Sequence, residues 1–297
     1  MRSALATALC VILAALPAHA APKVLATIKP VHSLVASVMA GAGAPPELLI
    51  QGAQSEHSYA LKPSDAARIG GAAVIFEIGP DLETYLTRPL ATLAHGSVVV
   101  LETAPGVKRL PARWGGLWDE TRAVTETAPD PHLWLDPENA VAMTAAIVAA
   151  LSKADPAHAA LYAANGRTQI ARLTAQEKDL AARLAPLRGR RYIVFHDAYQ
   201  YFERRFGLSS VGAVTVAPDR PVGPRRVSML RDAIRARGVA CVFREPQFPP
   251  ALIQTLVDGS PARIGVLDPL GAELAPGPEL YPKLLDAIAA SLRSCLA

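Results

Sequence analysis

Three histidines stand beside acidic residues at widely separated points of the chain. The segments that contain them are Glu56-His57, Asp130-Pro131-His132 and His196-Asp197. Neutral imidazole is the commonest metal ligand and suits zinc, and a carboxylate can complete a tetrahedral set. Taken singly, each histidine is more often a satisfied loop or core residue than a ligand. Because all three have the same kind of setting, we expect them to converge on one metal ion.

The surrounding sequence predicts that these histidines lie where strands end. Residues 52–58 form a loop rich in small and polar residues, after the apolar run 48–50 and before a helix start at residues 63–65. His196 directly follows the apolar run 192–195. Open α/β sheets bind their ligands at the carboxyl ends of strands. Both positions therefore favour a shared cleft.

Three further residues could face that cleft. We expect His32, at another strand end, to line it behind the ligands. Asp268 ends the last expected strand, and would either coordinate the metal or hydrogen-bond a ligating histidine. Glu245 is also an acidic residue at a strand end, and we assign it a structural role.

The elements that position these residues alternate along the chain. Apolar runs of strand length are separated by helical stretches, and the expected strands are 24–28, 48–50, 74–78, 98–101, 192–195, 211–216, 240–243 and 264–267. Near-continuous apolar strands that alternate with helices indicate parallel sheets covered on both faces. The sequence therefore predicts an α/β fold with two lobes, each a mostly parallel sheet flanked by helices.

A long helix is expected between the two lobes. Asp155-Pro156 is a typical helix start, and the helical pattern continues to about residue 187, a length of about 45 Å. We interpret it as a rigid strut, with the metal site in the cleft beside it; a long surface helix within one domain is the alternative. The expected division is 21–154 for the N-terminal lobe, 155–188 for the linking helix and 189–297 for the C-terminal lobe.

Residues 1–20 have the pattern of a secretory signal peptide, cleaved after Ala20 and leading to the periplasm. Cys10 leaves with this segment, and Leu9 before it is too large for a lipoprotein cleavage site. The two remaining cysteines, Cys241 and Cys295, favour a disulfide in an exported chain, with two buried free thiols as the alternative.

The charge pattern argues against a nucleic-acid partner. The formal net charge is +4, and it becomes +3 when Arg2 leaves with the signal peptide. The arginines occur in short scattered runs, whereas a nucleic-acid interface needs a longer basic stripe interleaved with aromatic residues. We interpret the arginines as solvated faces and helix ends.

Several segments together carry a family resemblance: residues 55–65, 132–135, 195–203, 241–248 and 267–271. In this order they resemble the periplasmic zinc-binding receptors of bacterial ABC importers, the ZnuA type, over essentially the whole mature chain. The resemblance implies two lobes joined by a long helix, with the metal between them. It also supports a Cys241–Cys295 bridge.

The resemblance further implies a function and a ligand set. The zinc ligands would be His57, His132 and His196, with Glu56 at the fourth position. The protein would be a monomeric receptor, not an enzyme, that carries Zn²⁺ as transported cargo to an inner-membrane ABC permease. Related manganese receptors use the position of Asp268 and replace one histidine with a carboxylate, so three histidines favour zinc over manganese or a broader divalent range.

One feature departs from the family. Many zinc receptors carry a long loop rich in histidine and acidic residues before the second ligand, whereas residues 115–131 contain acidic residues and no histidine. A role of this loop in gathering extra zinc is therefore not expected.

Two other classes of protein are weaker alternatives. A secreted zinc hydrolase needs an open coordination position and a general base beside the metal-bound water, and the chain has no His-Glu-x-x-His pair. A surface adhesin needs an anchor, and no attachment segment is present in the sequence.

Overall fold

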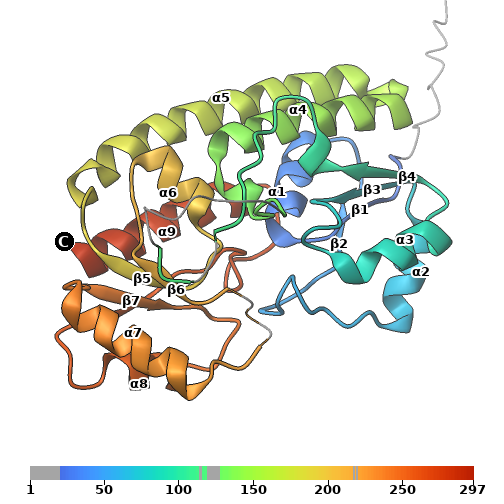
Figure 1. The fold of residues 1–297 in the computed structure, drawn as a ribbon. Helices are drawn as coiled ribbons and strands as arrows, with labels where there is room; N and C mark the ends of the chain where they lie inside the picture. Colours follow the sequence, from blue (N-terminus) through green and yellow to red (C-terminus); the bar gives the residue numbers. More distant parts are fainter. Residues whose placement is uncertain (1–20, 114–115, 119–127, 217, 219) are drawn as a thin grey trace, which may run out of the picture.

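Two four-stranded parallel sheets form the framework of the protein (Figure 1). The computed structural model describes residues 21–113, 116–118, 128–216, 218 and 220–297. The first sheet has the order β2-β1-β3-β4 and the second the order β6-β5-β7-β8. The strands are β1 Val24–Ala26, β2 Glu47–Leu48, β3 Val74–Glu77, β4 Ser97–Val100, β5 Tyr192–His196, β6 Gly212–Thr215, β7 Cys241–Arg244 and β8 Arg263–Val266.

Helices flank both sheets. Those of the first lobe are α1 Lys29–Val38, α2 Pro63–Gly71, α3 Thr87–Leu93 and α4 Pro137–Ala154, and those of the second lobe are α6 Gln200–Phe206, α7 Pro224–Ala236, α8 Ala251–Val257 and α9 Leu280–Leu296. Short 3₁₀ turns are η1 Thr84–Leu86, η2 Leu101–Thr103, η3 Leu133–Leu135, η4 Pro156–His158 and η5 Ala185–Leu187. Among the described residues, no helix is both long and apolar enough to cross a membrane.

The long helix α5, Ala159–Leu184, runs along both lobes (Figure 1). Its 26 residues span about 39 Å, and it packs beside α4. The expected fold class, two parallel sheets flanked by helices with one long helix, is confirmed. The expected signal peptide, residues 1–20, lies outside the described residues.

Two elements of the first lobe are irregular. The segment after β3 first forms the 3₁₀ turn η1 and becomes α-helical only at α3. Strand β2 is shorter than the apolar run suggests, yet Leu49 N and Ile50 N still donate to Ala26 O and Thr27 O. The pairing thus continues for two residues past the regular strand and fixes the start of the loop that carries Glu56 and His57.

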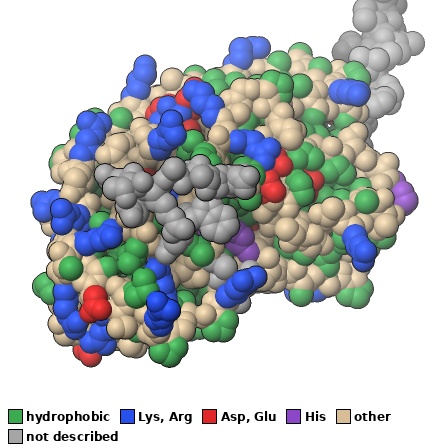
Figure 2. Space-filling model, viewed as in Figure 1, with side chains coloured by type: hydrophobic (Ala, Val, Ile, Leu, Met, Phe, Trp, Pro, Cys, Tyr) green, Lys and Arg blue, Asp and Glu red, His purple; other side chains and the backbone are tan. Residues whose placement is uncertain are grey.

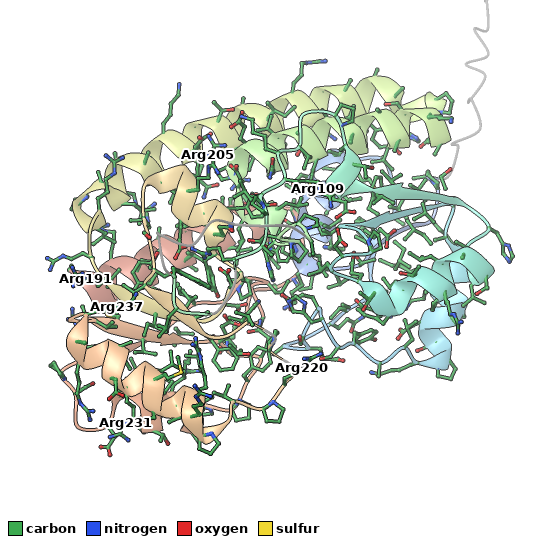
Figure 3. All side chains as sticks on the ribbon, viewed as in Figure 1. Arg109, Arg191, Arg205, Arg220, Arg231 and Arg237 are labelled. Carbon is green, nitrogen blue, oxygen red and sulfur yellow. A yellow bond between two sulfur atoms is a disulfide. The ribbon has the colours of Figure 1, made fainter. Side chains whose placement is uncertain are left out.

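The two lobes contact each other directly. The Trp134 indole donates to Pro269 O at 2.8 Å, and the Tyr281 hydroxyl donates to Trp134 O at 2.6 Å. Arg205 on α6 points toward α4 (Figure 3), where its guanidinium binds the Asp136 carboxylate at 2.7 and 2.9 Å. One hydrophobic core includes residues of both lobes. Packing within the chain therefore sets how the lobes face each other.

A disulfide joins Cys241, the first residue of β7, to Cys295 near the end of α9, with 6.1 Å between the Cα atoms. The expected disulfide is therefore confirmed, and the alternative of two free thiols is wrong. The bridge ties the C-terminal helix to the end of the sheet opposite the carboxyl ends of its strands.

Replacing both cysteines by alanine should lower the free energy of unfolding by about 2–4 kcal/mol, because a bridge across a separation of 54 residues restricts the unfolded chain. Urea denaturation of the parent, with and without reductant, measures this change. The double-alanine variant is the control. Reductant should lower the urea midpoint of the parent towards that of the variant, and should leave the midpoint of the variant unchanged. Equal midpoints for the oxidised parent and the variant would contradict the prediction.

Candidate metal centre

Four side chains with metal-binding atoms meet between the two sheets. They are Glu56, His57, His132 and His196, and one donor atom from each lies within 4.8 Å of all the others. His132 Nε2 lies 3.1 Å from both His57 Nε2 and His196 Nε2. Glu56 Oε1 lies 3.8 Å from His57 Nε2. The structure thus brings together all four residues that the sequence singled out.

The members of the cluster come from three different structural settings. Glu56 and His57 lie in the loop between β2 and α2, and His132 directly precedes η3. His196 is the last residue of β5. The carboxyl ends of parallel strands meet at one edge of a sheet, and here the two edges face each other. The site therefore joins the lobes.

Most of the cluster is buried. Glu56, His132 and His196 are almost fully buried, whereas the His57 side chain is 18% exposed. Figure 2 shows histidine surface in the middle of this face, between the lobes. A cation would therefore be shielded from water except beside His57.

The spacing fits a tetrahedral zinc ion. With Zn–N bonds of about 2.0–2.1 Å, tetrahedral geometry puts two ligand nitrogens about 3.3 Å apart. The observed separations of 3.1 Å need only a slight expansion. Glu56 Oε1 is buried and lacks a hydrogen-bond partner, although buried polar atoms are usually satisfied. A bound cation would supply that missing partner.

Two carboxylates orient two of the imidazoles. Asp130 Oδ1 lies 2.8 Å from His132 Nδ1 and also accepts the backbone N–H of His132 at 3.0 Å. Glu245 Oε2 lies 2.6 Å from His196 Nδ1. A proton held on Nδ1 leaves Nε2 of the neutral ring with its lone pair aimed into the cluster, as in many metal sites.

The structural role assigned to Glu245 from the sequence was therefore wrong, because this carboxylate contacts a member of the cluster. The register of the strands explains this contact. Cys241 in β7 pairs with Tyr192 in β5. The residues four positions further along, Glu245 and His196, therefore emerge side by side at the same edge of the sheet. The sequence contains both residues but not the pairing of their strands.

Burial and charge give the cluster unequal pKa values. Burial lowers the pKa of His57 and of His132 well below the usual value, and neighbouring imidazoles add to this effect. For His196 burial acts in the same direction, but the nearby carboxylates, Glu245 foremost, together outweigh it and raise the pKa to about 9. Burial raises the pKa of Glu56 to about 7. Without a metal, the cluster therefore holds a proton on His196 at neutral pH.

Two other candidates from the sequence do not join the cluster. His32 Nε2 lies 3.0 Å from Pro46 O, a contact within the first lobe. Asp268 is near enough for its charge to affect Glu56, but its oxygens accept hydrogen bonds from Gln247 and from its own loop. Neither contributes an atom to the group of four.

Comparison with known proteins gives a consistent result over nearly the whole chain. The profile of the family described as "ZnuA: Zinc-uptake complex component A periplasmic" matches residues 24–295. The chain is 44% identical over 306 residues to the high-affinity zinc uptake system protein ZnuA of Brucella suis, covering 92% of this chain and 91% of that protein. It is 34% identical over 309 residues to the protein of the same name from Paracoccus denitrificans, covering 95% of this chain and 94% of that protein.

Among solved structures, the periplasmic zinc binding protein TroA from Treponema pallidum has the same fold, with a TM-score of 0.81 at 22% identity. The match covers 93% of this chain and 99% of that one. The structural likeness supports the fold, and the profile and the sequence relatives support the family. With this fold, and with its three histidines and one glutamate gathered between two lobes, the chain belongs to the ZnuA family.

Proposed function

We propose that this chain is a periplasmic solute-binding receptor that captures zinc and delivers it to an ABC importer in the inner membrane. The observation that carries the proposal is the buried group of four donor atoms, one of which is a carboxylate oxygen without a partner. The named activity of the relatives, high-affinity zinc uptake, supports the same cargo. Residues 1–20 would act as the export signal, and the mature protein would work as a monomer.

The donor set favours zinc over manganese. Three imidazoles and one carboxylate suit zinc, whereas manganese prefers oxygen ligands. Asp268, the carboxylate that could add oxygen character, is engaged elsewhere. A site rich in histidine would also accept copper by the Irving–Williams order, so selectivity against copper would depend on metal supply.

The same geometry favours binding over catalysis. A catalytic zinc site keeps a coordination position open for water or substrate. Here four protein donors are available for one tetrahedral ion, and each has a place in the shell. Glu56, the carboxylate nearest His57 Nε2, is itself one of those donors and is not free to act as a general base.

The mature chain should bind one zinc ion per molecule, with the four side chains as its ligands. Equilibrium dialysis of chelator-treated protein against buffered zinc measures the stoichiometry, and X-ray absorption of the zinc-loaded protein reports nitrogen and oxygen neighbours. A stoichiometry near zero would overturn the proposed function.

Zinc affinity should fall as the pH is lowered, and the fall should begin above the usual range of histidine. Zinc needs the Nε2 lone pair of His196, whose pKa is about 9, so binding displaces about one proton between about pH 9 and pH 7. Below about pH 7 the Glu56 carboxyl holds a second proton. The apparent affinity should therefore drop roughly tenfold per pH unit above pH 7 and more steeply below it.

Competition titration with a zinc chelator between pH 6 and pH 9 tests this slope. Calorimetry in two buffers of different ionisation enthalpy counts the released protons independently. An affinity that stays constant between pH 9 and pH 7 would mean that His196 carries no proton in the metal-free protein.

Removing His196 should cost more zinc affinity than removing Glu56. His196 is the only member of the cluster on the second sheet, so His196→Ala deletes that sheet's link to the metal and should lose well over 100-fold in affinity. Glu56→Ala leaves three imidazoles, and water can fill the vacated position, so a loss of roughly 10–100-fold is expected. Zinc-induced thermal stabilisation should follow the same order.

Titration and melting of both variants beside the parent measure the two effects. His158→Ala is a matched control, because His158 lies in η4 and pairs with Asp155 instead of the cluster. A greater loss in Glu56→Ala than in His196→Ala would show that the first-lobe pair is the main anchor.

A further inference from the structure

Asp268 is a carboxylate beside the metal centre, and both of its oxygens accept hydrogen bonds. Oδ1 accepts the Gln247 amide N–H at 2.9 Å and the backbone N–H groups of Leu270 and Gly271, both at 3.0 Å. Oδ2 accepts the backbone N–H of Ala272 at 2.5 Å. Three of these four hydrogen bonds fall on Oδ1 and one on Oδ2, so both oxygens are held against their own loop and Gln247.

Lys29 holds the same loop from its other side. It is the first residue of α1 in the first lobe and is 5% exposed. Its ammonium donates to three carbonyls of the second lobe, those of Gly271 at 3.1 Å, Ala272 at 2.6 Å and Leu274 at 3.2 Å. The ammonium thus uses its three donors across the lobe interface.

The two sets of bonds act on the same peptide groups. Gly271 and Ala272 turn their N–H groups to Asp268 and their carbonyls to Lys29. Burial lowers the pKa of Lys29, and the charge of Asp268 acts in the opposite direction. The ammonium, the oriented peptides and the carboxylate therefore form one continuous arrangement, which we call the Lys29–Asp268 clamp.

The clamp lies close to the proposed zinc ligands. Pro269, the residue after Asp268, accepts the Trp134 indole N–H at 2.8 Å, and the Trp134 ring centroid lies 5.3 Å from that of His132. Gln247, which donates to Asp268, lies two residues after Glu245. Tyr199 donates to Glu245, the carboxylate that orients His196. Asp268 is thus near the centre, but its oxygens face its own loop.

We propose that Lys29 is a specificity-determining positioning residue, which holds Asp268 out of the metal centre and keeps the site four-coordinate. This inference rests on the proposed zinc-binding function. Without the ammonium, the carbonyls of residues 271, 272 and 274 lose their donor, and the loop that cages Asp268 loses its attachment to the first lobe. The freed carboxylate can then enter the centre as an additional oxygen ligand. A site with an additional carboxylate oxygen and a higher coordination number favours manganese relative to zinc.

The experiment compares metal preference in the parent, Lys29→Met, Asp268→Asn and the double variant. Methionine keeps the length of the side chain and removes the donor. Competition titrations give the ratio of the Kd for Mn²⁺ to the Kd for Zn²⁺. Lys29→Met should lower this ratio by roughly tenfold or more, Asp268→Asn should leave it unchanged, and the double variant should return it to the parental value.

Cobalt gives a second readout that a loss of stability alone does not change. The visible absorption of Co²⁺ is strong in tetrahedral sites and weaker at higher coordination numbers. The parent should give the strong spectrum and Lys29→Met the weaker one, with the strong spectrum restored in the double variant. Gln247→Leu, which removes one bond to Asp268 without touching Lys29, should shift the spectrum in the same direction by a smaller amount.

The outcomes separate this inference from the proposed function. A parent that binds no zinc overturns both. A parent that binds zinc, together with a Kd ratio and a cobalt spectrum unchanged in folded Lys29→Met, overturns the role of Lys29 alone. A shift that persists in the double variant also overturns it, because Asp268 would then not be the added ligand. If circular dichroism shows that Lys29→Met does not fold, Gln247→Leu becomes the deciding variant. A cobalt absorption spectrum that is unchanged in Gln247→Leu would then contradict the proposed role of the Lys29–Asp268 clamp.

Discussion

The convergence of three imidazole nitrogens on one point depends on the contact between two separately formed sheets. His132 lies two residues before Trp134, whose fully buried indole donates to the carbonyl of Pro269 in the second lobe. The Tyr281 hydroxyl binds the carbonyl of the same tryptophan. The segment that carries His132 is thus fixed between the lobes by ordinary packing and hydrogen bonds. Because these side chains are already ordered in the metal-free protein, metal binding loses little free energy in ordering them.

Such a cluster must also be tolerable when no metal is present. Buried charges are costly unless they are paired. The His196 imidazolium is paired with Glu245 at 2.6 Å, and burial raises the pKa of Glu56 to about 7, so that this carboxyl is partly neutral at physiological pH. Metal entry exchanges the protons for a cation. The interior therefore keeps its charge approximately balanced in both states, without a large rearrangement of the chain.

Much of this organisation could be predicted from the sequence because the inner strands of the two sheets are buried, although the edge strands β4 and β8 are partly exposed. Every residue of β3 and β5 is buried, which gives the continuous apolar runs, and residues directly after such runs must emerge at one edge of a sheet. The position of His196 could be predicted in this way, whereas the full set of proposed ligands also needed the resemblance to the family. The roles of Glu245 and Lys29 were not predicted, because they depend on which strands are neighbours and on how the lobes meet. The order β6-β5-β7-β8 brings Glu245 to His196, and no local pattern encodes that order.

The two sheets have the same strand order, yet they present their members of the cluster differently. The second sheet presents His196 from its central strand β5, with Glu245 bound to Nδ1. The first lobe presents Glu56 and His57 from a loop beyond its edge strand β2. Within the part of the chain that the structure describes, His57 is also the one imidazole of the cluster without a hydrogen bond to a carboxylate, and it is the most exposed member at 18%. A loop with few contacts can open at a lower cost than a central strand. The proposed receptor would thus hold its cargo rigidly through His132 and His196 and more adjustably through the loop of Glu56 and His57, an arrangement suited to a protein that must both capture a metal tightly and give it up.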